Sequence, residues 1–309
     1  MSELTLRILF AVVAAPLALL IVLVGGAPLA ALLAVVSALG AWEFFRIARA
    51  SGHRPLDDVG IALAGLVPLA LHAQYLGLVA LRPALVAVVA LAVLAATIWL
   101  RGVEGQPLGS AATSLLGVVY TAGMLSFGYA IRYHDIVRGY DVVGAHRLAL
   151  GPLSFGVPPG GVLLIFPMVV TWASDIGAYF VGRALGRRKL IPAVSPGKTI
   201  AGAVGSLVLC MIVAWAYQRW VLVPQATLSL RPFVPALSAS GALLFGAIIS
   251  VAAQVGDLAE SLIKRESGVK DSSHLIPGHG GVLDRLDSLF FVLPVAYLVF
   301  DWLLIPALR

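Results

Sequence analysis

Long apolar runs separated by short polar stretches dominate the chain. A bilayer core of about 30 Å requires roughly 20 consecutive, mostly apolar residues, because a helix rises about 1.5 Å per residue. Nine segments meet this requirement and predict nine membrane-spanning helices. The predicted spans are residues 6–24, 27–47, 59–80, 83–100, 108–131, 161–181, 199–222, 236–255 and 282–306.

The overall composition indicates the same class of protein. Hydrophobic residues make up 60% and charged residues 12% of the 309 residues, and the mean hydropathy is +0.99. These values exclude the surface of an ordinary soluble protein. The first apolar run also has features of a signal peptide, but eight further spans behind it favour an uncleaved helix. We therefore predict an all-α, polytopic integral membrane protein with about nine transmembrane helices.

The distribution of basic residues predicts the orientation, because lysine and arginine in short loops stay cytoplasmic. With the N-terminus inside, 14 of the 21 lysines and arginines face the cytoplasm. Nine of these 14 lie in the loops before the seventh and ninth spans, and this positive face should attract anions. The alternative is a topology signal that also attracts acidic lipid. The net charge of +6 does not imply nucleic-acid binding, since no basic segment interleaved with aromatic residues accompanies it.

Three regions follow from this pattern. Residues 1–131 hold about five transmembrane helices, and residues 132–160 form an extracytoplasmic loop. Residues 161–309 hold about four helices and the polar groups, and we expect them to form the catalytic region, with its site facing the cytoplasm.

The stretch "SDIGAYFVGR" ends the sixth span with polar residues on one helix face. Asp175, Ala178, Tyr179 and Gly182 are spaced i, i+3, i+4 and i+7, so they share that face. Ionisable groups in spans are candidates for function. The alternative is a helix-packing face with a hydrogen-bonded aspartate.

The stretch "SPGKT", residues 195–199, opens the seventh span. It resembles the end of a P-loop, but the earlier glycine of that motif would have to be at Pro192, and we reject it. What remains is Ser195 and Lys198 at a helix N-terminus, where free N–H groups favour an anion. The alternative is a plain N-cap with a lysine reaching to the interface.

The stretch "QVGDLAESLIKRE" carries a second polar stripe in the eighth span. Asp257, Glu260, Ser261 and Lys264 again follow i, i+3, i+4 and i+7 spacing. A helix end with internal salt bridges is the alternative. The polar segment 270–287 follows, with glycines at 280 and 281 and with Asp284 and Asp287 at the start of the ninth span.

Carboxylates beside basic residues point to metal and phosphate chemistry. Asp257 with Asp284 or Asp287 offers hard oxygen ligands of the kind that Mg²⁺ prefers. Neighbouring cations can clamp phosphates, and phosphoryl or nucleotidyl transfer depends mostly on positioning and charge neutralisation. A phosphate nucleophile is already an anion, so no general base is required. The basic residues are Lys264, Arg265, Lys270 and Arg285.

The residues from 261 to 287 resemble the signature of the phosphatidate cytidylyltransferases, also called CDP-diacylglycerol synthases. The matching positions are Ser261, Leu262, Ile263, Lys264, Arg265, Lys270, Asp271, Ser273, Ile276, Pro277, His279, Gly280, Gly281, Asp284, Arg285 and Asp287. The resemblance covers roughly residues 160–309. It implies an all-helical membrane enzyme that joins CTP and phosphatidic acid to give CDP-diacylglycerol and pyrophosphate, with Mg²⁺ or a similar divalent cation.

The same resemblance assigns roles to individual residues. It implies metal ligation by Asp257, Asp284 and Asp287, and a catalytic role for these three and Lys264. It also implies a polar cavity open to the cytoplasm and the bilayer, a bacterial inner-membrane location and a family in which homodimers occur. The implied substrate-binding residues are Asp175, Tyr179, Ser195, Lys198, Ser261, Arg265, Lys270, His279, Gly280, Gly281 and Arg285.

One position departs from the family pattern. The family commonly has a glutamate three residues after the lysine of the "SPGKT" motif, and this chain has Ala201. Either that carboxylate is dispensable or Glu260 replaces it. Two other functions remain open: a related nucleotidyltransferase acting on another phospholipid, such as an isoprenoid ether lipid, and a transporter whose charges line a path.

Overall fold

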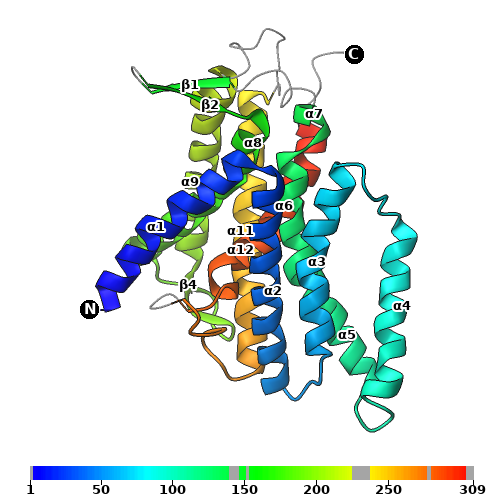
Figure 1. Cartoon of the computed structure of the whole chain (residues 1–309). Helices are drawn as coiled ribbons and strands as arrows, with labels where there is room; N and C mark the ends of the chain where they lie inside the picture. Colours follow the sequence, from blue (N-terminus) through cyan, green and yellow to red (C-terminus); the bar gives the residue numbers. More distant parts are fainter. Residues whose placement is uncertain (1–2, 139–145, 151–152, 225–236, 277–279, 304–309) are drawn as a thin grey trace. The chain divides into compact units, whose positions relative to one another are not determined.

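The computed structural model describes residues 3–138, 146–150, 153–224, 237–276 and 280–303, and helices dominate them (Figure 1). In lipid only a helix or a closed barrel satisfies every backbone polar group, so long apolar runs become helices. Prolines open α4, α5 and α8, where a missing N–H is harmless. The helices are α1 (Glu3–Val24), α2 (Gly26–Ala50), α3 (Asp57–Tyr75), α4 (Pro83–Leu100), α5 (Pro107–Val118), α6 (Met124–Arg132), α7 (Asp135–Arg138), α8 (Pro159–Leu185), α9 (Ile200–Tyr217), α11 (Ala239–Glu266) and α12 (Leu283–Leu303), with π-helical turns η1 (Val119–Gly123) and η2 (Gln218–Leu222).

Seven helical stretches within the described residues are long and apolar enough to cross a bilayer. The prediction of an all-helical, polytopic membrane protein is confirmed, and seven of the nine predicted spans correspond to these stretches. The other two, 6–24 and 59–80, are also helical but fall outside the seven. In α1, the apolar stretch Val12–Val24 is shorter than a span. Helix α3 begins with two charged residues, Asp57 and Asp58. The seven are Gly26–Ala50, Pro83–Leu100, Pro107–Val137, Pro159–Leu185, Ile200–Leu222, Ala239–Glu266 and Leu283–Leu303.

The chain forms two compact units, each made of segments distant in sequence. Unit 1 comprises Met1–Pro16, Gly26–Tyr129 and Glu260–Phe290. Unit 2 comprises Leu17–Gly25, Ala130–Ala259 and Phe291–Arg309. Each unit contains part of the polar sequence that the motifs identify.

Small residues allow the helices of unit 1 to approach closely. The ring of Phe45, on α2, is fully buried and packs against Gly60 of α3 and Gly117 of α5. A methyl group at either glycine would overlap that ring. Close packing of this kind is the main attraction between helices in lipid, where the hydrophobic effect is absent.

Unit 2 is organised around the pair α8 and α9. Gly177 lies against the backbone of Gly205 and Ser206, so the two helices are in close contact. Beside this pair, Phe166, Phe245 and Phe300 form a buried aromatic stack with ring centroids 4.4 and 5.0 Å apart. Offset stacking of aromatic rings adds stability beyond the area they bury.

Two antiparallel hairpins complete the described fold. Strands β1 (His146–Leu150) and β2 (Leu153–Val157) pair with Leu148 opposite Phe155. Strands β3 (Lys189–Ile191) and β4 (Ser195–Thr199) pair with Lys189 opposite Thr199 and Ile191 opposite Ser195. The "SPGKT" motif is therefore a strand preceding a helix, and not the first turn of the helix.

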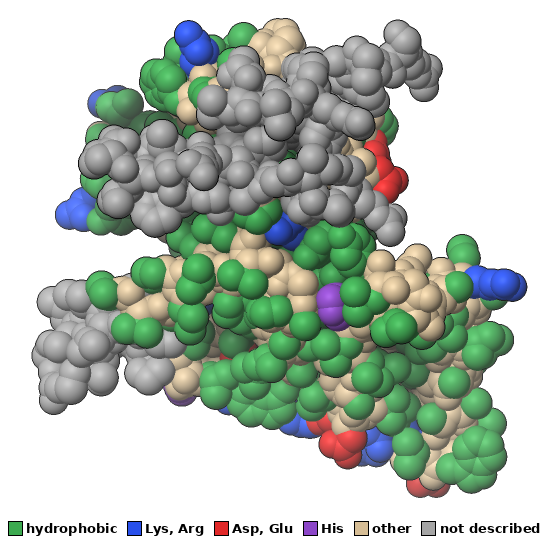
Figure 2. All heavy atoms as spheres, turned by 45° about the horizontal axis from the view of Figure 1, so that its top comes forward, with side chains coloured by type: hydrophobic (Ala, Val, Ile, Leu, Met, Phe, Trp, Pro, Cys, Tyr) green, Lys and Arg blue, Asp and Glu red, His purple; other side chains and the backbone are tan. Residues whose placement is uncertain are grey.

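Hydrophobic side chains cover much of the described surface (Figure 2). On α4, Val86 is 73% and Trp99 80% exposed. An apolar surface of this extent is stable only against lipid or another apolar partner. The surface therefore agrees with a membrane-embedded protein.

Candidate active site

A cavity of about 550 Å³ with several polar side chains in its wall lies in unit 2, at the ends of α8 and α9 that flank hairpin β3–β4. Residues Asp175, Tyr179 and Gly182 of the first polar stripe line it, as the shared helix face predicted. Two roles were considered for this face, a functional site and helix packing. Gly182 serves both, because it lines the cavity and also packs against Thr199 and Gly202. The main polar side chains of the wall are Asp175, Tyr179, Arg183, Lys198, Gln254 and Asp257.

A lysine and a carboxylate meet in this cavity. The Nζ atom of Lys198, on β4, lies 2.6 Å from Oδ2 of Asp257, on α11. Both side chains are partly exposed, at 24% and 35%. Across the cavity wall, Nη1 of Arg183 donates a 2.8 Å hydrogen bond to Oη of Tyr179. The cavity wall thus carries two cations and two acids, and the Nζ atom of Lys198 is itself buried.

Thr199 caps the helix that follows the motif. Its Oγ1 accepts a 3.1 Å hydrogen bond from the N–H of Gly202, the usual N-cap arrangement for α9. The prediction that Ser195 and Lys198 stand at the helix N-terminus was wrong. Both residues belong to strand β4, which immediately precedes α9. Lys198 nevertheless lines the cavity, while Ser195 is half-buried in the hairpin.

A ladder of hydroxyl groups lies beside the cavity. The hydroxyl of Ser174, on α8, is 2.7 Å from that of Ser206, on α9, which is 2.8 Å from that of Ser250, on α11. The amide of Gln254 donates to Ser250 at 3.0 Å. All three serines are buried, so each polar group has a partner inside an otherwise apolar region.

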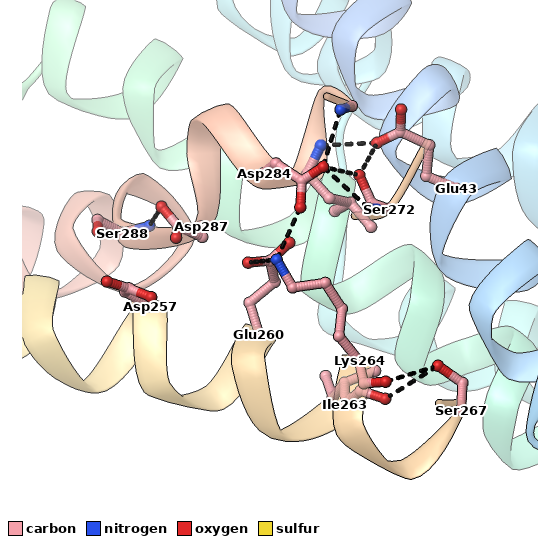
Figure 3. Close-up of polar contacts among 12 residues, drawn as sticks. Glu43, Asp257, Glu260, Ile263, Lys264, Ser267, Ser272, Asp284, Asp287 and Ser288 are labelled. Atoms are coloured by element: carbon pink, nitrogen blue, oxygen red, sulfur yellow. Dashed lines mark hydrogen bonds and ion pairs between the residues drawn. The ribbon is translucent and has the colours of Figure 1, made fainter. Parts of the chain in front are cut away.

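Unit 1 contains a second charged cluster, centred on Lys264 (Figure 3). Its Nζ atom lies 2.8 Å from Oε2 of Glu260 and 2.7 Å from Oδ1 of Asp284. The first pair follows the i, i+4 spacing in α11, and the second joins α11 to the start of α12. The three side chains are nearly buried, with exposed fractions of 13%, 3% and 6% for Lys264, Glu260 and Asp284.

The second oxygen of Asp284 binds the polar segment that precedes α12. Oδ2 accepts hydrogen bonds from the N–H of Ser272 at 2.9 Å, from its hydroxyl at 2.8 Å and from the N–H of Gly281 at 2.8 Å. Gly280 adopts φ = 81°, and a Cβ there would meet Oδ2 of Asp284 at 2.7 Å. Glycine at this position therefore lets the backbone fold around the carboxylate.

A buried glutamate that the sequence reading did not select completes this cluster. Glu43, on α2, is 0% exposed, and its carboxylate accepts hydrogen bonds from Ser272, Ser273, Val282 and Leu283. The signal was present, because a lone acid inside an apolar span is costly unless it has partners. We expected the polar groups of the site in residues 161–309, and Glu43 lies outside that region.

The remaining predicted residues of unit 1 lie on α11, on α12 or in the segment between these helices. Oδ1 of Asp287 accepts a 2.6 Å hydrogen bond from the N–H of Ser288, and Ser261 is half-buried on α11. Gly281 is buried against Ser272 and Glu43. His279 lies outside the described residues. The exposed cations are Arg265, Lys270 and Arg285.

The unit 1 cluster contains carboxylate oxygens, the donor type that hard cations take. Three carboxylates, those of Glu43, Glu260 and Asp284, are accompanied by the single ammonium of Lys264. In addition, Oε1 of Glu260 is buried without a hydrogen-bond partner. Oxygen donors with excess negative charge are the ligands that Mg²⁺ and Ca²⁺ take. Among the described residues, however, no group of three or more acidic, histidine or cysteine side chains is arranged as a metal cage.

These features define a class, the all-helical polytopic membrane proteins with lysine–carboxylate pairs in the C-terminal half. Within this class the chain belongs to the cytidylyltransferase family, which matches residues 5–303. The resemblance seen in residues 261–287 is thereby confirmed, and the chain is a member of a family of nucleotidyltransferases.

Similarity to individual proteins covers nearly the whole chain in one relative and about half of it in two others. A phosphatidate cytidylyltransferase of Synechocystis sp. is 34% identical over 315 residues, covering 99% of both chains. One of Haemophilus influenzae is 42% identical over 153 residues, 50% of each chain. One of Pseudomonas aeruginosa is 45% identical over 138 residues, 45% of this chain and 47% of the relative.

Proposed function

We propose that the protein is a phosphatidate cytidylyltransferase, which converts CTP and phosphatidic acid to CDP-diacylglycerol and pyrophosphate. The observation that carries the proposal is the relative of that name from Synechocystis, which is similar over 99% of both chains. The two lysine–carboxylate pairs support it, because they place cations for phosphates beside acids for a metal.

The proposed reaction is an in-line displacement at phosphorus. A phosphate oxygen of phosphatidic acid forms a bond to the α-phosphorus of CTP, and the bond from that phosphorus to the bridging oxygen of the β-phosphate breaks. Pyrophosphate leaves with the electron pair of the broken bond. The nucleophile is an anion at neutral pH, so no side chain has to remove a proton from it.

The basic residues have the task of positioning the two anionic substrates. Lys198 lines the cavity of unit 2, and Lys264 stands between two carboxylates in unit 1. An ammonium that pairs with a carboxylate can also pair with a phosphate oxygen at a similar distance. We assign Arg265, Lys270 and Arg285, which are exposed, to the triphosphate or the lipid phosphate. Asp175, Tyr179, Ser195 and Ser261 are further candidates for substrate contacts.

A divalent cation, Mg²⁺ or one similar to it, is part of the proposal. Asp257, Asp284 and Asp287 are the proposed ligands, and the unpartnered oxygen of Glu260 is a further oxygen donor in the cluster of Asp284. When bound, the cation would neutralise charge on the triphosphate and make the α-phosphorus a better electrophile. The residues of this chain would hold the cation and align the two phosphates.

The proposed setting is the bacterial inner membrane, with the site open to the cytoplasm, where CTP is present. The support is the excess of lysine and arginine in the loops on that side. Phosphatidic acid reaches the site from the surrounding membrane lipids. A homodimer agrees with the family and with the exposed apolar face of α4.

Incubation of the purified protein with labelled CTP and a panel of phospholipids tests the proposal. The panel holds phosphatidic acid, an isoprenoid ether phosphate and a neutral diacylglycerol, and lipid extraction follows. We expect labelled CDP-lipid with phosphatidic acid, none with diacylglycerol, and none with Asp257→Asn. Label in the ether lipid alone would show that the substrate is that lipid and not phosphatidic acid. No label with any lipid would overturn the proposal.

A further inference from the structure

We propose that Glu43 is a positioning residue, which fixes the two described ends of one segment, residues 272–273 and 282–283, so that Asp284 is presented to Lys264. Glu43 lies on α2, far in sequence from this segment, and no motif includes it. The inference itself concerns the conformation of unit 1. Its activity measurements rest on the proposed function.

The carboxylate of Glu43 is fully occupied by donors from one segment. Oε1 accepts from the hydroxyl of Ser273 and from the N–H of Val282 at 2.9 Å. Oε2 accepts from the hydroxyl of Ser272 at 3.1 Å and from the N–H of Leu283 at 2.7 Å. Both ends of the segment are thus tied to one side chain that is 0% exposed (Figure 3).

Ser272 connects Glu43 to the charged cluster. Its hydroxyl lies within hydrogen-bond distance of both Oε2 of Glu43 and Oδ2 of Asp284, at 3.1 and 2.8 Å. Its N–H donates to Oδ2 of Asp284 as well. One serine therefore bridges the two acids, and a displacement of Glu43 is transmitted through Oδ2 to the carboxylate that pairs with Lys264.

Gly281 completes the enclosure of the glutamate. A Cβ at this position would overlap the hydroxyl of Ser272 and Oε1 of Glu43. The N–H of the same residue donates to Oδ2 of Asp284. The backbone at residue 281 therefore lies within contact distance of both acids only because it carries no side chain.

Only a carboxylate satisfies all four donors. The N–H groups of Val282 and Leu283 bind different oxygens, and neither N–H can accept a hydrogen bond. In Glu43→Gln, whichever way the amide turns, its NH₂ faces one of these two N–H groups. Two donors then meet, and the start of α12 must move. Glutamine is otherwise isosteric, so the change removes the acceptor and keeps the packing.

The test compares Glu43→Gln with Glu104→Gln, the same change at an exposed glutamate of unit 1. We expect Glu43→Gln to lower kcat by about 10- to 100-fold, the range typical of partners that orient a metal ligand. We expect the KM for phosphatidic acid to stay constant and the Mg²⁺ concentration for half-maximal rate to rise. In hydrogen–deuterium exchange, the amides of residues 272–288 should exchange faster while those of α8 and α9 are unchanged. Glu104→Gln should match the wild type.

Ser272→Ala provides a second variant that leaves the glutamate in place. If Glu43 acts through Ser272, the double variant Glu43→Gln/Ser272→Ala should be little worse than the more affected single variant, because the two effects are not additive. Multiplying effects would overturn the proposed route. Wild-type kinetics for Glu43→Gln, or faster exchange throughout the protein, would overturn the positioning role. An inactive wild type would instead contradict the proposed function, and the local exchange would still decide the role of Glu43.

Discussion

Lys264 and Asp284 form the pair that joins the two helices of the signature segment. Nζ of Lys264 lies 2.7 Å from Oδ1 of Asp284, and Oδ2 of the same carboxylate is held by Ser272 and Gly281. The two oxygens therefore have separate partners. Oδ1 pairs with an ammonium, and Oδ2 accepts from two backbone N–H groups and a hydroxyl. A carboxylate fixed at both oxygens presents a cation with a single, defined geometry.

Replacement of Asp284 with asparagine should abolish activity at a modest loss of stability. The amide removes one acceptor and the negative charge, but Lys264 keeps Glu260 as its partner. We expect CDP-lipid formation to fall more than about 100-fold and the free energy of unfolding to fall by about 1–3 kcal/mol. Rate measurements and thermal unfolding in the same detergent check both values. A variant with the wild-type rate would remove Asp284 from the site.

Lys198→Gln tests the cavity of unit 2, with Lys189→Gln in the same hairpin as the control. Lys189 is exposed on β3 and lies outside the cavity lining, whereas Lys198 faces Asp257 inside it. Loss of a charge-assisted contact to phosphate should lower kcat/KM by about tenfold or more for Lys198→Gln alone. Stability should change little, because the pair is partly exposed. Equal effects of the two substitutions would indicate a general charge effect.

Gly281→Ala and Gly109→Ala separate a crowded glycine from an open one. A methyl group at residue 281 would overlap Ser272 and Glu43, whereas one at residue 109 meets nothing within 4 Å. We expect the first to lose about 1–3 kcal/mol and activity, as overpacked sites do. The second should be neutral or gain up to about 1 kcal/mol. Thermal unfolding measures both, and a Gly281→Ala protein as stable and active as the wild type would contradict the enclosed geometry.

The predicted orientation can be checked by labelling single cysteines. Cys210 is buried and is the chain's one cysteine, so Cys210→Ala gives a background without thiols. In that background, Leu78→Cys should react with a membrane-impermeant maleimide added to intact cells. Arg187→Cys should react only after the membrane is permeabilised. Both native side chains are exposed, so access is not limited by burial. The reverse pattern would invert the topology.

Sequence reasoning predicts this fold well where a local rule applies. The length of an apolar run predicts a spanning helix, because in lipid the backbone N–H and C=O groups of a single segment must bond to each other. The i, i+4 spacing predicts the pair of Glu260 and Lys264, and the structure contains it. Hairpin β3–β4 was not predicted, since five residues with two small ones and a proline show no alternating pattern.

Contacts between distant segments were beyond any local rule. Glu43 lies on α2 and Ser272 in the segment between α11 and α12, so their hydrogen bond depends on how α2 packs. The family resemblance also implied that Asp257, Asp284 and Asp287 form one ligand set. In the structure, Asp257 pairs with Lys198 in unit 2 and Asp284 with Lys264 in unit 1, and a shared ion remains a prediction.

The hydroxyl ladder of Ser174, Ser206 and Ser250 limits how the protein can move. A shift of α9 by one turn, about 5.4 Å, would separate the hydroxyl of Ser206 from those of Ser174 and Ser250, and breaking buried hydrogen bonds is costly. The three helices therefore have a fixed axial register. Hairpin β3–β4 contributes no hydroxyl to this ladder, so a movement of the hairpin alone would leave these hydrogen bonds intact.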